Sequence, residues 1–350
     1  ALIGPPGSGK TFQLQQLLAH HPPHVLAISC CLYRESARSF VQRLLCAILQ
    51  AGLTELYLTL EPERPGSLDT HSAQHSLEVL LHGAEHHIPN TAAAARALES
   101  LFMRRIDGEA LHRTLDLIPV LSEERRQLCV LILDEFLLLE DLGFPQAFHE
   151  LGKRVMTWPS TLFILSSSSV HRARLILRER LHLLFGQFEL LTLEMLNPPT
   201  AAAWATQELD GMEGLEAISP FLIGWLGTHP WYLTVFLKRL KELTALSQST
   251  ILTEPLFFQT AWDLLGSPEG VLHQWCRSRI EALPEGRLGA RALEALIRMA
   301  VGARTMTEIG ASIGRAGLTD ALQLLIERDL AQRHGSCWMI PDPILRCWLS

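Results

Sequence analysis

Short apolar runs alternate with amphipathic stretches over the first two hundred residues of the chain. Four of these runs are candidate strands, at 24–31, 128–136, 160–169 and 185–196. Continuous apolar runs of strand length predict strands that are covered on both faces, as in a parallel sheet. Helical spacing between them, as in residues 34–50, predicts crossover helices. The alternation predicts an α/β fold with a parallel sheet and right-handed crossovers.

The pattern changes after residue 197, where helical spacing continues without convincing strands. From residue 287 onward a helix, a short second helix, a third helix and a hairpin follow one another, which is the order of a winged helix. We therefore expect three domains: an α/β core at 1–197 with a helical insertion at about 53–120, a helical domain at 198–286 and a winged-helix domain at 287–350.

The first apolar stub is followed by a complete phosphate-binding motif. Eight residues match the spacing G-x-x-x-x-G-K-[ST]: Gly4, Pro5, Pro6, Gly7, Ser8, Gly9, Lys10 and Thr11. Glycines let the main-chain N–H groups of such a loop face a phosphate, and the following helix points its positive end at the same anion. We expect Lys10 to reach the β- and γ-phosphates and Thr11 to ligate Mg²⁺. The alternative, a chance glycine-rich turn, is disfavoured by the full motif between an apolar stub and a helix.

Only three residues precede this motif, and the chain does not begin with Met. A strand normally leads into such a loop, so we expect further sequence upstream.

An acidic pair ends the second apolar run, at Asp134 and Glu135. A Mg-nucleotide site needs a carboxylate at the tip of a neighbouring strand. We expect Asp134 to hold Mg²⁺ through water and Glu135 to orient or deprotonate the attacking water. The alternative is a helix-capping pair after a core strand, and the upstream phosphate motif favours the functional interpretation.

Four serines, Ser166 to Ser169, end the third apolar run. We predict that Ser166 and Ser167 lie between the γ-phosphate and the attacking water, and the alternative is a turn-forming serine cluster. A guanidinium after this strand would stabilise charge on the transferred phosphoryl group. The candidates are mostly expected on a solvated helix face, and none is selected: Arg172, Arg174, Arg178 and Arg180.

The segments GPPGSGKT, VLILDEF and LFILSSSS together resemble the archaeal-type ATPase family, within the AAA+/STAND group of P-loop NTPases. The segment LGTHPWYLTVFLKRL is similar to that family's GG-x-P-x-x-L segment at the start of a helical lid, with Thr228 in place of the second glycine. By this resemblance Pro230 would pack near the nucleotide. The ending CWMIPDPILRCWL resembles the family's winged-helix ending. The resemblance covers roughly two-thirds of the chain and leaves 53–120 unmatched, and the preference for adenine is implied by the family alone.

Composition and charge restrict the partners. The chain has 350 residues and a net charge of −7, so no overall attraction to nucleic acid or anionic membrane is expected. Seven cysteines without a C-x-x-C pair indicate reduced thiols and a cytoplasmic location. No apolar run reaches the length of a membrane span. The expected recognition helix, 318–330, carries three acidic residues against one arginine, which is a poor footprint for DNA.

The leading hypothesis is a Mg²⁺-dependent ATPase, slow or partner-stimulated, that switches the conformation of core, lid and winged helix. A second hypothesis is a scaffold or signalling module that holds nucleotide with little turnover. A third is a nucleic-acid-dependent AAA+ ATPase. ATP and Mg²⁺ are the expected cofactors, and a protein partner or self-assembly is favoured over nucleic acid, with no membrane partner.

Overall fold

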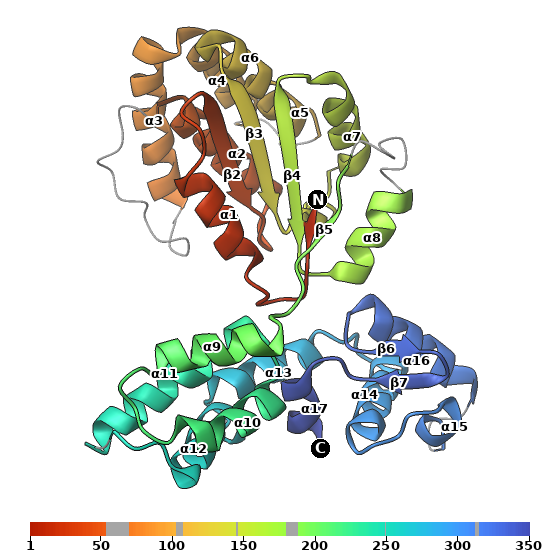
Figure 1. Cartoon of the computed structure of the whole chain (residues 1–350). Coiled ribbons are helices and arrows are strands. Elements are labelled where there is room, and N and C mark those ends of the chain that lie inside the picture. The colour runs from red at the N-terminus through yellow and green to blue at the C-terminus, as the bar shows by residue number, and fades with distance from the viewer. Residues whose placement is uncertain (54–69, 103–107, 145, 180–187, 249, 312–314) are drawn as a thin grey trace. The chain divides into compact units, whose positions relative to one another are not determined.

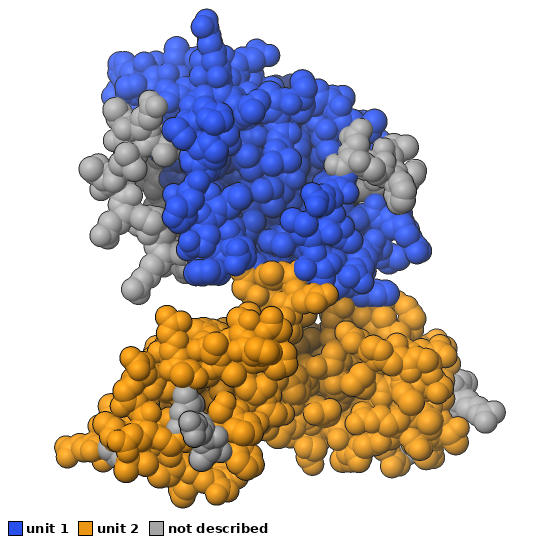
Figure 2. Space-filling view, in the orientation of Figure 1, with its two compact units in different colours: residues 1–4, 10–192 blue, residues 5–9, 193–350 orange. Residues whose placement is uncertain are grey.

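The computed structural model describes residues 1–53, 70–102, 108–144, 146–179, 188–248, 250–311 and 315–350 (Figure 1). These residues form two compact units (Figure 2). The first contains residues 1–4 and 10–192, and the second contains residues 5–9 and 193–350.

The first unit is built on a five-stranded sheet in which every printed pairing is parallel. Its spatial order is β2-β3-β4-β1-β5. The strands are β1 (Leu2–Ile3), β2 (Val25–Cys31), β3 (Leu128–Asp134), β4 (Thr161–Ser167) and β5 (Leu191–Thr192). The α/β parallel sheet predicted from the alternating apolar runs is confirmed.

The three long strands lie within the predicted runs, and their buried side chains, such as Ile28, Leu131 and Leu165, are fully enclosed. The fourth run is a strand only at Leu191–Thr192, and residues 185–187 of that run lie outside the described residues. The short edge strand pairs with β1 because its main chain meets Leu2 and Ile3 in register.

The helices of the first unit are α1 (Lys10–Ala19), α2 (Ala37–Leu53), α3 (Thr70–His87), α4 (Pro89–Phe102), α5 (Gly108–Leu115), α6 (Leu117–Arg125), α7 (Ala147–Thr157) and α8 (Val170–Glu179), with a 3₁₀ turn η1 at Phe136–Leu139.

The described part of the stretch 53–120, predicted as a helical insertion, is helical. Helix α2 packs against α3, and α4 packs against α6. The Glu124 carboxylate accepts hydrogen bonds from the N–H groups of Asn90 and Thr91, at 2.7 and 2.9 Å, and so caps the start of α4. Leu81 and Ile118 are buried in the same hydrophobic core as the strands, so these helices are part of the unit's core.

The second unit is mainly helical. Its elements are α9 (Pro198–Glu208), α10 (Leu215–Leu226), α11 (Pro230–Leu246), α12 (Glu254–Ala261), a π-helical turn η3 (Trp262–Gly266), α13 (Val271–Glu281), α14 (Arg287–Ala300), α15 (Met306–Ile309), α16 (Arg315–Glu327), the antiparallel strands β6 (Gln332–His334) and β7 (Cys337–Met339), and α17 (Pro343–Leu349).

A long apolar stretch in this unit, 218–243, is divided into two helices. Gly227 has a φ of +65° and ends α10, and Pro230 then occupies the first turn of α11, where a missing N–H group costs nothing. The sequence 227–230 therefore works as a stop followed by a start.

One hydrophobic cluster includes Leu233 and Phe236 of α11 together with Leu296 of α14 and Leu322 of α16. Helices α14 to α16 and the hairpin follow in the order predicted for a winged helix. The division at residue 286 into lid and winged-helix domains stays a prediction, since both parts share this core. Among the described helices, none is both long and apolar enough to span a membrane.

Candidate active site

The predicted phosphate loop joins β1 to α1, and Lys10 is the first residue of that helix. The Lys10 side chain is buried, and its Nζ donates a hydrogen bond to the Gly4 carbonyl at 2.8 Å. Burial lowers the pKa of Lys10, while the charges of Glu135 and Asp134 act in the opposite direction. The helix thus begins with a desolvated cation that lies near two carboxylates.

The loop residues Gly7 and Gly9 have φ values of +73° and +96°, a backbone conformation that side chains other than glycine resist. The N–H of Ser8 donates to the Pro5 carbonyl at 3.2 Å. Within the described part of the chain, the buried Ser8 hydroxyl has no hydrogen-bond partner. An orphaned hydroxyl inside a glycine-rich loop is compatible with a polar ligand such as phosphate.

Asp134 ends β3 and gathers polar groups from three segments. Its Oδ2 accepts a hydrogen bond from the Thr11 hydroxyl at 3.0 Å. Its Oδ1 accepts from the Ser166 hydroxyl and from the N–H of Glu135, the latter at 3.1 Å. Carboxylate and hydroxyl oxygens are the ligands that Mg²⁺ prefers, so these residues fit that ion.

Glu135 follows β3 in the left-handed backbone region, with a φ of +56°. Such a conformation costs a non-glycine residue about 1–3 kcal/mol and persists only where the surroundings hold it. The holding partner is Ser168, whose N–H lies 3.1 Å from each Glu135 carboxylate oxygen and whose hydroxyl donates to Oε1. The predicted base is therefore bound by a residue at the end of the neighbouring strand.

The register of β1 against β4 brings the serine cluster beside the loop. Leu2 pairs with Ser166 and Ile3 with Ser167, and the N–H of Gly4 lies 3.4 Å from the Ser167 carbonyl. Ser166 and Ser167 are both fully buried.

The serine side chains divide between different partners. Ser166 contacts Asp134, and the Ser167 hydroxyl accepts from the N–H of Ser169 at 3.1 Å. Ser168, which the sequence analysis did not select, contacts Glu135. The run of four serines signalled a site, but only the β3–β4 pairing determines which serine faces which acid.

The arginines after β4 show no convergence on these acids in the described structure. Arg172 pairs with Glu140, and the Arg174 guanidinium lies 3.5 Å from the Thr192 hydroxyl. Arg178 is exposed and lies 3.6 Å from Glu179, and Arg180 lies outside the described residues. No arginine is selected for a catalytic role.

In the second unit, residues 5–9 contact the segment before α11. The Nε2 of His229 donates to the Pro6 carbonyl at 2.9 Å. A Cβ atom added at Gly7 would lie 2.6 Å from Cε1 of His229 and 2.9 Å from Cβ of Trp231. The role predicted for Pro230 stays a prediction. The side chain that the structure places on the loop belongs to the preceding residue, which the sequence analysis did not identify.

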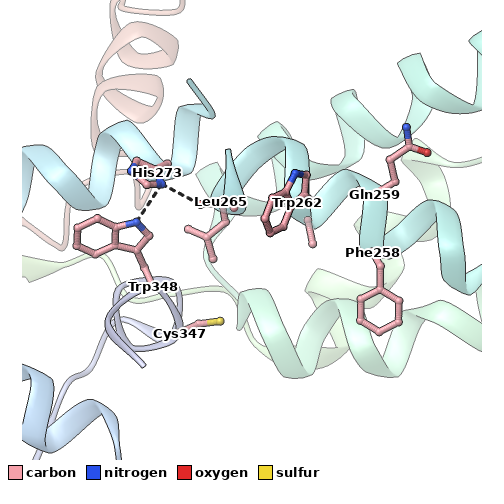
Figure 3. Close-up of a pocket in the computed structure, with 9 residues that line it drawn as sticks. Phe258, Gln259, Trp262, Leu265, His273, Cys347 and Trp348 are labelled. Carbon is pink, nitrogen blue, oxygen red and sulfur yellow. Dashed lines mark hydrogen bonds between the residues drawn. The ribbon is translucent and has the colours of Figure 1, made fainter. Parts of the chain in front are cut away.

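A separate cavity of about 780 Å³ lies in the second unit (Figure 3). Trp262, Leu265 and Trp348 line it, and the Trp348 Nε1 lies 3.1 Å from His273 Nδ1. None of the predicted site residues lines this cavity.

Searches against models of protein families and against curated proteins gave no match. Comparison with solved structures gave a Walker-type ATPase of Pyrococcus abyssi, with a TM-score of 0.66 and 15% identity over 99% of this chain and 89% of that chain. It also gave the ORC2 protein of Aeropyrum pernix in complexes with ADPNP and ADP, with a TM-score of 0.51 and 15% identity over 99% of this chain and 86% of that chain. The chain therefore has the fold of archaeal-type AAA+ P-loop ATPases, and the predicted fold class is confirmed.

Proposed function

We propose that this protein binds ATP with Mg²⁺ and hydrolyses it. One observation carries the proposal: Thr11, which ends the phosphate motif, lies within hydrogen-bond distance of Asp134, 123 positions further along the chain. A chance glycine-rich turn has no reason to end beside the acidic tip of a core strand. A nucleotide site requires this neighbourhood.

Each residue then has a role that follows from its chemistry. Lys10 and the main-chain N–H groups of residues 7–11 bind the phosphates, because the cation and the helix N-terminus both favour negative charge. Thr11 and Asp134 would hold Mg²⁺, which neutralises charge on the phosphate oxygens when bound. Glu135 orients the attacking water and accepts its proton once its carboxylate leaves Ser168.

The similar structures support this assignment at the level of fold. One is described as a Walker-type ATPase, and the other was solved with ADPNP and ADP. The same arrangement of sheet and loop in this chain is compatible with an adenine nucleotide.

Turnover of ATP tests the proposal directly. We expect Glu135→Gln to reduce turnover by about 100-fold or more while nucleotide still binds, because the proton acceptor is lost. We expect Lys10→Ala to weaken Mg–ATP binding as well. Lys153→Ala is a matched control, since Lys153 lies on α7 and pairs with Glu150. Equal hydrolysis by the wild type and all three variants would contradict the catalytic assignment.

A second candidate function, a module that holds nucleotide with little turnover, is favoured by the contact between Glu135 and Ser168. A carboxylate with hydrogen bonds on both oxygens is a poorer base than a free one. Nucleotide that stays bound through purification, together with negligible turnover by the wild type, would support this function over hydrolysis.

We propose further that loss of the γ-phosphate changes the conformation of the lid and the winged helix, with a protein partner or a second copy as the recipient of the change. Nucleic acid is the weaker candidate because the predicted recognition helix is acidic, and Arg328 donates to the Ala282 carbonyl at 3.2 Å. Duplex DNA that stimulated turnover at low salt would reverse this order.

A further inference from the structure

His229 makes a specific contact with the phosphate loop, inside the second unit. Its side chain is 7% exposed, and its Nε2 lies 2.9 Å from the Pro6 carbonyl oxygen. Gly7 approaches the same ring so closely that a single added Cβ would overlap its Cε1. The loop therefore rests on this imidazole through one hydrogen bond and one close packing contact.

The hydrogen bonds of the ring define its tautomer. A carbonyl can only accept, so Nε2 carries the proton in the bond to Pro6. Nδ1 accepts from the N–H of Tyr232 at 3.4 Å and thereby caps the first turn of α11. Both nitrogens are used in the neutral form, and a proton on Nδ1 would remove the cap.

The opposite face of the ring is held by Tyr232. The two rings stack with centroids 3.9 Å apart and an interplanar angle of 18°. The Tyr232 hydroxyl donates to Asp342 at 2.6 Å and accepts from Trp275 Nε1 at 3.0 Å. Arg279 completes the group with a 3.0 Å contact to Asp342.

Asp342 in turn caps α17, since its Oδ1 accepts from the N–H groups of Ile344 and Leu345, both at 3.0 Å. A stacked ring that is anchored to a buried ion pair and two helix ends has little freedom to move. His229 therefore presents its N–H to the loop in a fixed direction.

We propose that His229 is a positioning residue that holds the phosphate loop in a nucleotide-binding conformation through the Pro6 carbonyl. This inference rests on the proposed function. Pro5 and Pro6 have no N–H groups of their own, so a carbonyl contact from outside is an effective way to orient this part of the loop. The nucleotide then meets a loop that is already ordered, and less entropy is lost on binding.

Two substitutions separate the two bonds of the ring. His229→Asn places an oxygen where Nδ1 was, so it keeps the helix cap and removes the loop bond. His229→Gln places an N–H donor near the position of Nε2, so it keeps the loop bond and removes the cap. Full-length protein is used for both, with wild type and Lys10→Ala measured in parallel.

The first measurement needs no nucleotide. Hydrogen–deuterium exchange of the amides at residues 7–11 should become roughly five- to tenfold faster in His229→Asn than in wild type, as expected from loss of one buried hydrogen bond, with recovery in His229→Gln. Equal exchange in wild type and His229→Asn would overturn the proposal, whatever the protein binds.

The second measurement is Mg–ATP affinity and turnover. His229→Asn should weaken binding and raise KM by roughly five- to tenfold with kcat retained, and its Tm should stay close to that of wild type. A lower Tm with unchanged Kd would assign His229 a structural role only and overturn the proposal. Binding by Lys10→Ala equal to wild type would instead contradict the proposed function, so the two failures are distinguishable.

Discussion

The carboxylate of Glu135 is bound by Ser168, through the main-chain N–H at 3.1 Å from each oxygen and through the hydroxyl. The two residues follow neighbouring parallel strands, and Glu135 adopts a left-handed backbone to make the contact. The structure therefore shows the candidate base in a bound state.

Ser168→Ala should raise kcat for ATP by roughly two- to tenfold, because loss of one hydrogen bond makes the carboxylate easier to release. Steady-state hydrolysis at saturating Mg–ATP measures this. Ser168→Thr keeps the hydroxyl and serves as the control, with turnover near wild type. A decrease in Ser168→Ala would mean that Ser168 holds Glu135 in its productive position.

Gly7 and Gly9 provide a matched pair of substitutions in the loop. Both have positive φ, so alanine at either position costs about 1–2 kcal/mol of backbone strain. An added Cβ at Gly7 also overlaps His229, whereas a Cβ at Gly9 has no heavy atom within 4 Å among those described. Gly7→Ala should therefore lower the free energy of unfolding by about 1–3 kcal/mol more than Gly9→Ala, as measured by urea denaturation. Equal effects would show that the contact with His229 is absent in solution.

Tyr232→Phe removes a hydroxyl that links Asp342 and Trp275 in a buried group. Burial and the Asp342 charge raise the pKa of Tyr232, so the hydroxyl stays protonated and donates to the carboxylate. Its loss should reduce the free energy of unfolding by about 1.5–3 kcal/mol, the usual range for a hydrogen bond to a charged group. A change within about 0.5 kcal/mol in chemical denaturation would show that water replaces the hydroxyl.

The stability of the protein should depend on the protonation of His229. Burial lowers the pKa of His229 below its ordinary value of 6.5, Arg279 acts in the same direction, and Asp342 and the bond to Pro6 oppose it. Because the unfolded chain binds the proton first, the contribution of this residue is complete above about pH 6.5 and is lost as the pH falls toward the lower pKa of the folded state. Thermal unfolding between pH 7.5 and 5.5 should show a steeper loss of stability in wild type than in His229→Asn. Parallel slopes would assign the acid sensitivity to other groups.

Removal of the metal should have different effects on wild type and Asp134→Asn. Thr11 and Asp134 supply the oxygens that fit Mg²⁺. EDTA should therefore weaken ATP binding to wild type and should have little effect on Asp134→Asn, as measured by calorimetry. An equal loss in both proteins would place the metal ligand elsewhere.

The α/β class and the phosphate loop could be predicted from the sequence because they depend on local features. Continuous apolar runs such as 128–134 have few alternatives to a buried strand, and G-x-x-x-x-G-K-[ST] specifies its own turn chemistry. The pairing of Asp134 with a metal-binding loop was also predictable, since the carboxyl ends of parallel strands share one edge of a sheet.

The partners of individual side chains were decided only by tertiary structure. Ser166 was predicted for the γ-phosphate and contacts Asp134 here, and Ser168 contacts Glu135. His229 lies more than 220 positions from Pro6 and carries no motif that names its partner. Local periodicity determines which faces are buried, whereas strand register and helix packing determine which polar groups meet, because those contacts form only when distant segments come together.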